Sequence, residues 1–221
     1  MNSMAATYTP ARRTALVFVL VAIVLAACGT SDADTPGAAG AASDGTFEGV
    51  AIELPRPKPE FVLTDTSGDP YDFAAETADR VTLLYFGYTF CPDICPVHLS
   101  QIEAALDRPG APRNVDVVFV TVDPERDSPA RLRSWLDNFG TGVVGLTGTE
   151  EELVAAQEAA GLVPASRYDD DGEGNYLMAH AGQVIAYAPD GLAYVEYPFG
   201  TRQSHWVHDL PILATLGGDP T

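Results

Sequence analysis

Two kinds of hydrophobic pattern alternate along the chain from about residue 60 onward. Continuous apolar stretches rich in β-branched and aromatic residues, Val81–Gly87 and Val115–Val122, predict buried strands. Apolar positions with helical spacing follow Pro96, Ser128 and Thr149, and they predict helices. Strands that alternate with helices predict an α/β domain in which helices flank a central sheet.

Turn signals predict a β-hairpin near each end of this region. The turn-rich segment Asp65–Pro70 separates two short strand patterns, and Asp190-Gly191 separates Gln183–Ala188 from Leu192–Val195. An amphipathic pattern from about Arg202 to Leu216 predicts a last helix. Strands interleaved with helices, followed by an antiparallel hairpin, predict a thioredoxin-like fold with a central mixed sheet.

The first residues have the pattern of a secretory signal. Arg12 and Arg13 precede the apolar run Ala15–Ala27, which is shorter than the about 20 apolar residues of a membrane-spanning helix. The run ends in Leu-Ala-Ala-Cys28, which resembles the bacterial lipobox, where the cysteine is lipidated and becomes the mature N-terminus. We predict a lipoprotein signal peptide over residues 1–27 and a lipid anchor on the extracytoplasmic face of a bacterial membrane. An uncleaved N-terminal anchor is the alternative.

A linker pattern follows the signal. Residues 29–46 are Gly, Ala, Ser, Thr and Asp with one proline and no large apolar side chain, so they cannot contribute to a core. Residues 52–59 are proline-rich and expected to be extended. We therefore predict a flexible tether over residues 28–58 and a folded domain over residues 59–217.

The charge balance excludes some classes of partner. The 221-residue chain has 31 acidic and 12 basic residues, which gives a formal net charge of −19. Such a surface repels the phosphate backbone of nucleic acids, and it lacks the basic clusters that hold anionic lipids. We expect no nucleic-acid partner, and we expect membrane attachment through the lipid alone.

The cysteines carry the candidate chemistry. With Cys28 assigned to the lipid, only Cys91 and Cys95 remain, so the pair is a local disulfide, a redox couple, a metal chelate or an alternation of these. They lie in a loop between the strand Val81–Gly87 and a predicted helix N-terminus, where backbone N–H groups stabilise thiolate. Sulfurs four residues apart can converge on one ion, and soft thiolates select Cu(I).

The string Gly87-Tyr-Thr-Phe-Cys91-Pro-Asp-Ile-Cys95-Pro resembles the Sco/SenC family, thioredoxin-like factors that assist assembly of the copper centre of cytochrome oxidase. Thr121–Asp127 and Leu146–Thr149 are similar to two further family segments. The resemblance implies a copper site, for Cu(I) or Cu(II), made of Cys91, Cys95 and a late-hairpin histidine, which is His180 here. This chain has Ala-His180-Ala where the family commonly has Asp-His-Ser, so a group that could orient the imidazole is missing.

Two functions agree with the resemblance. The first is a metallochaperone that delivers copper to the copper-bearing oxidase subunit, or exchanges it with another copper chaperone. The alternative is an enzyme, a thiol–disulfide oxidoreductase that reduces the client's cysteines through a redox-active Cys91–Cys95 pair. Copper is favoured because thioredoxin-type reductases place a proline opposite their cysteines, and this chain has no proline from Ala165 to Ala188.

Other potential ligands receive structural interpretations. We expect His98 to lie on a helix surface, one turn beyond Cys95, and His205 and His208 to lie on a solvated helix face. We interpret Met178 as a packing residue, and Asp93 as a residue that shapes the loop.

Overall fold

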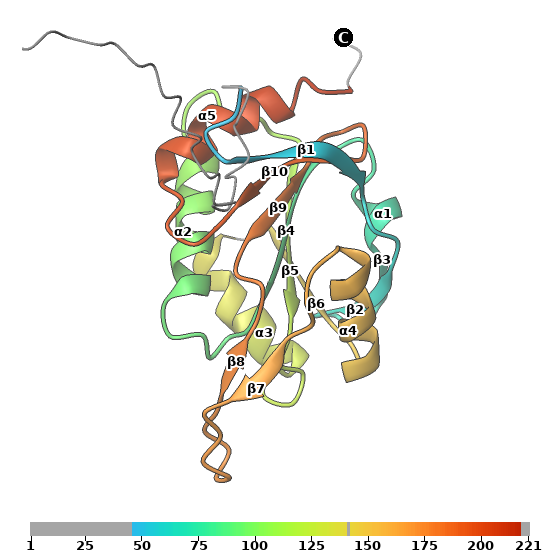
Figure 1. Ribbon diagram of the computed structural model, residues 1–221, viewed down its shortest axis with the longest axis vertical. Helices are drawn as coiled ribbons and strands as arrows, with labels where there is room; N and C mark the ends of the chain where they lie inside the picture. The colour runs from blue at the N-terminus through green and yellow to red at the C-terminus, as the bar shows by residue number, and fades with distance from the viewer. Residues whose placement is uncertain (1–45, 141, 218–221) are drawn as a thin grey trace, which may run out of the picture. The chain divides into compact units, whose positions relative to one another are not determined.

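A computed structural model of the chain describes residues 46–140 and 142–217 (Figure 1). The signal peptide, Cys28 and the tether as far as residue 45 lie outside the described residues. The described strands are β1 (Val50–Pro57), β2 (Val62–Asp65), β3 (Pro70–Asp72), β4 (Val81–Gly87), β5 (Val115–Thr121), β6 (Val143–Thr147), β7 (Ser166–Tyr168), β8 (Leu177–Ala179), β9 (Val184–Tyr187) and β10 (Leu192–Tyr197). The helices are α1 (Phe73–Glu76), α2 (Ile94–Leu106), α3 (Pro129–Leu136), α4 (Glu150–Ala159), α5 (Gln203–Leu213) and the 3-10 turn Asp137–Phe139.

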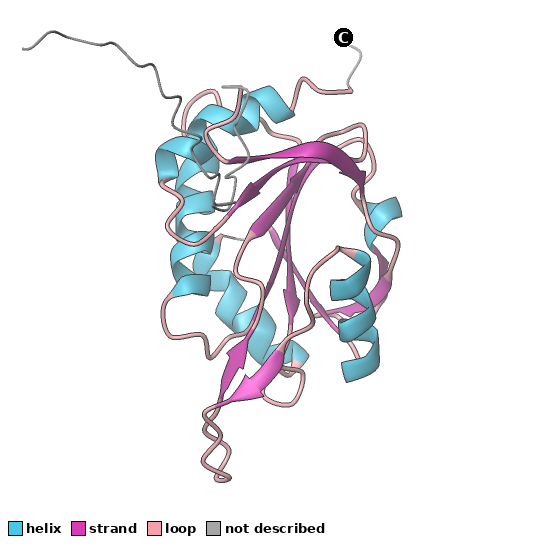
Figure 2. Ribbon diagram, viewed as in Figure 1, coloured by secondary structure: helices cyan, strands magenta, loops and turns pink. Residues whose placement is uncertain are grey.

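The main sheet is mixed and has eight strands in the order β1-β10-β9-β4-β5-β6-β2-β3. Strands β4, β5 and β6 are parallel, and β9 joins β4 antiparallel. Helices α2, α3 and α5 lie on one side of this sheet and α1 and α4 on the other (Figures 1 and 2). Helices on both faces of a mixed sheet confirm the predicted α/β, thioredoxin-like class.

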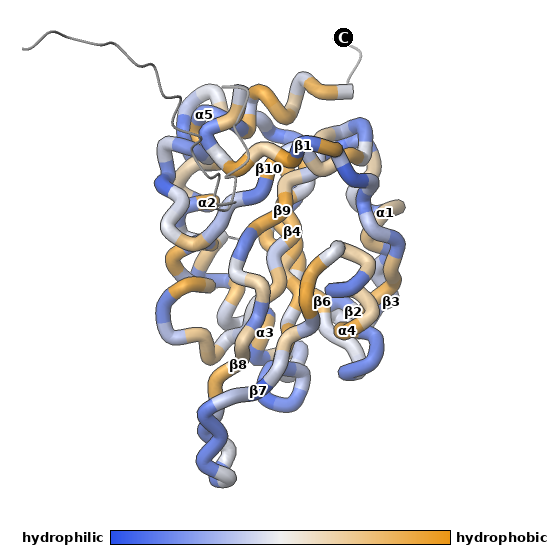
Figure 3. The backbone as a smooth tube through the Cα atoms, in the orientation of Figure 1, coloured by the Kyte–Doolittle hydropathy of each residue, from blue (hydrophilic) through white to orange (hydrophobic). Residues whose placement is uncertain are grey.

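The sheet centre is the hydrophobic core. Every residue of β4 is buried, and so is every residue of β9 beside it. Figure 3 shows the hydrophobic character of these central strands. Leu99 and Ile102 of α2 cover one face, and Trp206 of α5 packs on Tyr197 with ring centroids 3.8 Å apart. Because β4 is buried on both faces, its sequence is a continuous apolar run, as predicted.

Two predicted helix starts have the expected caps. The hydroxyl of Ser128 accepts from the N–H of Arg131, with Pro129 as the first residue of α3. Thr149 and Glu152 form a reciprocal capping box at the start of α4. Each cap satisfies backbone N–H groups that the first turn of a helix leaves without partners. Because the capping residues lie within that turn, the local sequence was enough to predict both helix starts.

The folded region begins earlier than predicted. Residues 50–57, which we assigned to the tether, form β1 and pair antiparallel with β10. Just before it, Phe47 is buried, and the amides of Glu48 and Gly49 donate to the Asp209 carboxylate, each at 2.9 Å. The proline-rich stretch is extended as expected, but it is an edge strand and not a linker. Prolines are tolerated there because one side of an edge strand needs no donors.

A two-stranded arm stands apart from the main sheet. Strand β8 pairs antiparallel with β7 in a separate sheet, and the connection between them projects from the body (Figure 1). Strand β7 was not predicted, because its three residues are all exposed and carry no hydrophobic pattern. The tip of the arm, residues 169–175, is strongly hydrophilic (Figure 3). In the part of the chain described, no helix has the length and apolarity needed to cross a membrane.

Candidate metal centre

The loop after β4 positions the two cysteines. Cys91 precedes α2 and Cys95 lies in its first turn, where the N–H of Cys95 donates to the sulfur of Cys91 at 3.4 Å. Gly87 ends β4 beneath them. A Cβ at this position would lie 2.8 Å from the Cys95 sulfur and 2.8 Å from the Phe119 ring. Only glycine therefore lets the strand pass this close to the sulfur.

The arm brings a histidine to the same place. His180 directly follows β8, and its Nε2 lies 3.9 Å from the Cys95 sulfur. The Cys91 sulfur, the Cys95 sulfur and a nitrogen of His180 all lie within 4.8 Å of one another. The Nδ1 of His180 lies 3.1 Å from the Ala181 carbonyl oxygen, and this contact turns the ring so that Nε2 faces the Cys95 sulfur. A backbone carbonyl thus orients the ring without the flanking Asp and Ser that the sequence lacks.

The two thiols differ in their environment. Cys91 is 9% exposed and Cys95 is fully buried; both are free thiols. A hydrogen bond from Cys95 lowers the pKa of Cys91 to about 4 despite partial burial, with further help from His180 and from backbone N–H groups. Burial raises the pKa of Cys95, and the neighbouring charge of Cys91 raises it further. The two sulfurs therefore share a proton through this hydrogen bond, and Cys91 is the thiol that ionises first.

The donor set fits a soft metal ion. Two sulfurs and one imidazole nitrogen within reach of a single ion are the ligands that copper and zinc prefer, and thiolate sulfur favours Cu(I). A bound cation would release the shared proton, because metals bind the thiolate form. A Cys91–Cys95 disulfide, the other predicted state, would remove both sulfur donors at once.

Arg126 connects the arm to the cysteine loop. Its guanidinium carbon lies 3.5 Å from the ring centroid of Tyr176 and 4.6 Å from that of Phe90, the residue before Cys91. It donates to the Asp123 carboxylate at 2.6 Å and to the Tyr176 carbonyl at 2.9 Å. Asp123 also accepts from the Tyr176 hydroxyl at 2.7 Å. One partly buried cation thus connects the loop after β5, the base of the arm and the residue before Cys91.

Two more contacts support the cysteine loop. The Tyr88 hydroxyl accepts from the Met178 N–H at 3.4 Å, and its ring meets His180 edge-on with centroids 5.7 Å apart. The buried Asp127 carboxylate accepts from the N–H of Thr89 at 2.9 Å and from the hydroxyls of Thr89 and Thr121 at 2.5 and 2.7 Å. Burial raises the pKa of Asp127, and these hydrogen bonds oppose that shift. Sequence analysis identified Thr121–Asp127 only by its similarity to a family segment, because the partners of Asp127 are not visible in a local pattern.

The remaining candidates lie elsewhere. His98 is fully buried against Tyr85 and Trp206, so our prediction of a surface histidine was wrong. It faces the core because α2 begins at Ile94, and the apolar face of the helix runs through Cys95, His98 and Ile102. His205 and His208 are partly exposed beside Glu48 and Asp209, away from the sulfurs, as expected.

The two smaller expectations also compare directly with the structure. Met178 is partly buried and packs against the core, which agrees with the packing role predicted for it. Asp93 is the N-cap residue of α2, but its side chain makes no capping hydrogen bond. Its backbone N–H contributes to lowering the Cys91 pKa, so its effect on the site comes from loop geometry.

The fold and the cluster of two thiols and one imidazole together define a class of protein. It is a thioredoxin-like domain in which a histidine lies beside the two cysteines of the loop. Comparisons with known proteins agree. The family model described as SCO1/SenC matches residues 51–214, and the chain belongs to this family. A candidate copper-binding protein of Stutzerimonas stutzeri is 38% identical over 62% of this chain and 68% of its own length. A SCO2-like protein of Rickettsia felis is 32% identical over 55% of this chain and 60% of its own length.

Solved structures show the same architecture. The apo Sco1 protein of Thermus thermophilus is 31% identical with a TM-score of 0.68, covering 76% of this chain and 97% of that one. The copper-bound ScoI of Bradyrhizobium japonicum is 27% identical with a TM-score of 0.62, covering 72% and 99%. The described region therefore corresponds to nearly the whole of these domains.

Proposed function

We propose that this protein carries copper. Cys91, Cys95 and His180 bind one copper ion, which the protein delivers to the copper-bearing subunit of a cytochrome c oxidase or exchanges with another copper chaperone. The observation that carries the proposal is the convergence of two sulfurs and one imidazole nitrogen within 4.8 Å. The copper-bound relative from Bradyrhizobium japonicum supports the choice of ion.

The site suits a cargo that must leave again. Cys95 is fully buried and Cys91 nearly so, which shields the ion from solvent, while His180 is partly exposed and borders an open cavity. Incoming ligands of a client can replace the imidazole first and the sulfurs afterwards. A lipid on Cys28 would confine this exchange to the extracytoplasmic membrane surface, where the client's copper site is located.

The geometry of the two thiols favours a second function, reduction of the client's disulfide. The less buried Cys91, with its pKa lowered to about 4, would attack one client sulfur and release the other as thiolate. Cys95 would then lose its proton and attack the Cys91 sulfur, which releases the second client thiol. Two electrons pass to the client, and the Cys91–Cys95 disulfide remains.

One pair of assays distinguishes the two functions. The reduced protein is titrated anaerobically with Cu(I) against a chelator of known affinity, and in parallel it is tested for reduction of insulin disulfides. Copper carriage predicts tight one-to-one binding that is lost in Cys95→Ser and retained in the control His205→Ala. Insulin reduction without tight Cu(I) binding would replace the carrier proposal with the reductase.

A further inference from the structure

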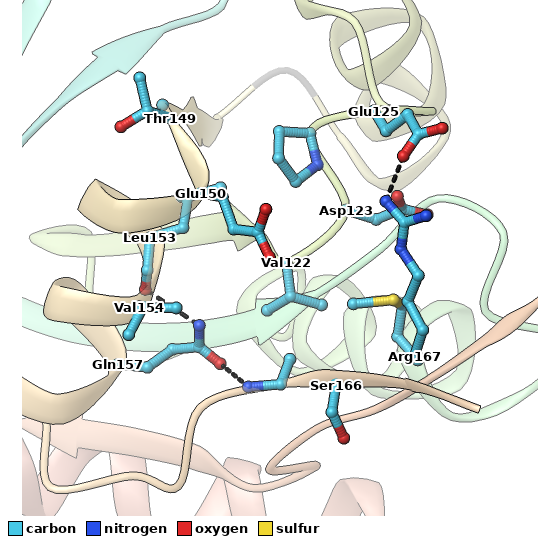
Figure 4. A pocket seen from close by; sticks show the side chains of 14 residues that line it. Val122, Asp123, Glu125, Thr149, Glu150, Leu153, Val154, Gln157, Ser166 and Arg167 are labelled. Carbon is cyan, nitrogen blue, oxygen red and sulfur yellow. Dashed lines mark hydrogen bonds and ion pairs between the residues drawn. The ribbon is translucent and has the colours of Figure 1, made fainter.

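A second cavity lies beside the metal donors, between the start of α4, the loop after β5 and the base of the arm (Figure 4). Its volume is about 330 Å³. Val122, Leu153 and Met178 give it apolar walls, and Glu125, Glu150 and Arg167 contribute charged groups. A cavity of this size with apolar walls and few charged groups is typical of a binding site.

Three acidic residues line the cavity, and within the described part of the chain only Glu150 has a side chain without a partner. Asp123 is bound by Arg126 and Tyr176, and Glu125 forms an ion pair with Arg167. Glu150 makes no hydrogen bond or ion pair with any described residue. In Figure 4 its side chain extends from α4 toward Val122, into the cavity. The cavity therefore combines apolar walls with a free carboxylate.

The cavity is close to the copper donors. Met178 lines it and stands two residues before His180, which directly follows β8. Ser166 lines both this cavity and the open cavity that borders His180. The cavity therefore adjoins the open cavity beside His180.

We propose that the cavity receives a lysine or arginine side chain of the client that docks over the copper site. The inference rests on the proposed function and identifies how the client is recognised. Lysine and arginine bury an aliphatic stem while the charged head stays at a polar group, which matches a cavity lined by Leu153, Met178 and Glu150. An anionic side chain would be repelled by the carboxylate of Glu150. A purely apolar side chain would remove water from this carboxylate without giving it a partner. The net charge of −19 further favours a basic partner.

The test uses small probes and the ¹⁵N-labelled, copper-free protein. Nα-acetyl-lysinamide and Nα-acetyl-argininamide are titrated while backbone amide shifts are followed. Both should give saturable shifts around Thr149, Glu150 and Ser166. Glu150→Gln should weaken binding about five-fold, the size expected for one partly exposed ion pair. Val154→Trp, which narrows the cavity without changing its charge, should abolish the shifts.

Matched controls decide the outcome. Glu151→Gln removes an equal charge from the same helical turn outside the cavity and should leave the affinity unchanged. Nα-acetyl-norleucinamide has a similar stem without the cation and should bind more weakly. Equal binding of norleucinamide, equal effects of Glu150→Gln and Glu151→Gln, or no saturable shift would each overturn the inference. These titrations contain no copper, so a negative result would contradict the proposed recognition of the client and not the proposed copper site. Cu(I) binding is titrated separately, and its affinity should be unchanged in Glu150→Gln.

Discussion

The guanidinium of Arg126 stacks on the ring of Tyr176 at 3.5 Å from its centroid, and both side chains bind the same carboxylate, that of Asp123. Tyr176 begins the segment that leads through β8 to His180. Arg126 also lies over Phe90, beside Cys91. The relationship therefore ties the position of His180 to that of the two cysteines.

Removing this cation should destabilise the protein and loosen the site. Arg126→Gln leaves the Asp123 carboxylate, 1% exposed, without its ion-pair partner, which we expect to cost about 3 kcal/mol of unfolding free energy. Urea denaturation measures the loss. Arg113→Gln, at an exposed position, should change stability by less than about 0.5 kcal/mol. Equal stabilities of the two variants would show that the Arg126 network is not a structural clamp.

Loss of the imidazole should affect the two copper oxidation states differently. In His180→Ala, Cu(I) can remain on two sulfurs, so we expect only partial weakening. Cu(II) favours nitrogen donors, so its visible charge-transfer band should be lost or strongly altered. Absorption spectra of the Cu(II)-loaded variant check this, with His205→Ala as a control that keeps the wild-type band. A wild-type band in His180→Ala would remove His180 from the ligand set.

His98 should make the protein sensitive to acid. The ring is fully buried, and burial lowers its pKa below the ordinary value of 6.5, against an opposing effect of the Pro198 backbone. Below about pH 6.5, His98 binds a proton in the unfolded chain but stays neutral in the folded chain. The free energy of unfolding therefore decreases as the pH falls through about 6.5 toward the folded-state pKa.

The slope of this loss approaches about 1.4 kcal/mol per pH unit for one proton. Urea unfolding of His98→Phe at pH 7 and pH 5 should show a smaller loss than wild type, because an apolar ring replaces the titrating one. His205→Phe, at a partly exposed site, should keep the wild-type pH dependence. The same loss in His98→Phe as in wild type would exclude His98 as its source.

Gly87 should not tolerate a methyl group. In Gly87→Ala the new Cβ would lie 2.8 Å from both the Cys95 sulfur and the Phe119 ring, so overpacking should cost about 1–3 kcal/mol. The displaced sulfur should also lower Cu(I) affinity. Gly142→Ala adds the same methyl group where no atom lies within 4 Å, and it should be neutral in both measurements. A neutral Gly87→Ala would mean that the loop accommodates the methyl group freely.

Cys28→Ala should release the protein from membranes without unfolding the domain. The prediction follows from the lipobox pattern, and the tether between Cys28 and residue 46 has no large apolar residue to place in a core. Membrane fractionation and the urea midpoint of the released protein check both parts. Retention of an uncleaved, membrane-bound variant would favour the alternative of a signal anchor.

Local patterns were enough to predict much of this protein. The continuous apolar runs identified β4 and β5 because strands buried on both faces must be apolar throughout. Ser128 and Thr149 marked helix starts because caps act within one turn of the chain. The cysteine loop was recognisable because both sulfurs belong to one short segment between a strand and a helix.

Other features were decided only by tertiary structure. The stretch that forms β1 looks like a linker until β10 supplies its hydrogen-bond partner, well over a hundred residues away. His98 is polar, so local sequence suggests a surface position, but the face of α2 that carries Cys95 must point inward and takes His98 with it. Arg126 and Glu150 are ordinary charged residues in the sequence. Whether a charged side chain is paired or lies free in a cavity depends on which distant segments pack against it. A local sequence pattern does not contain this information.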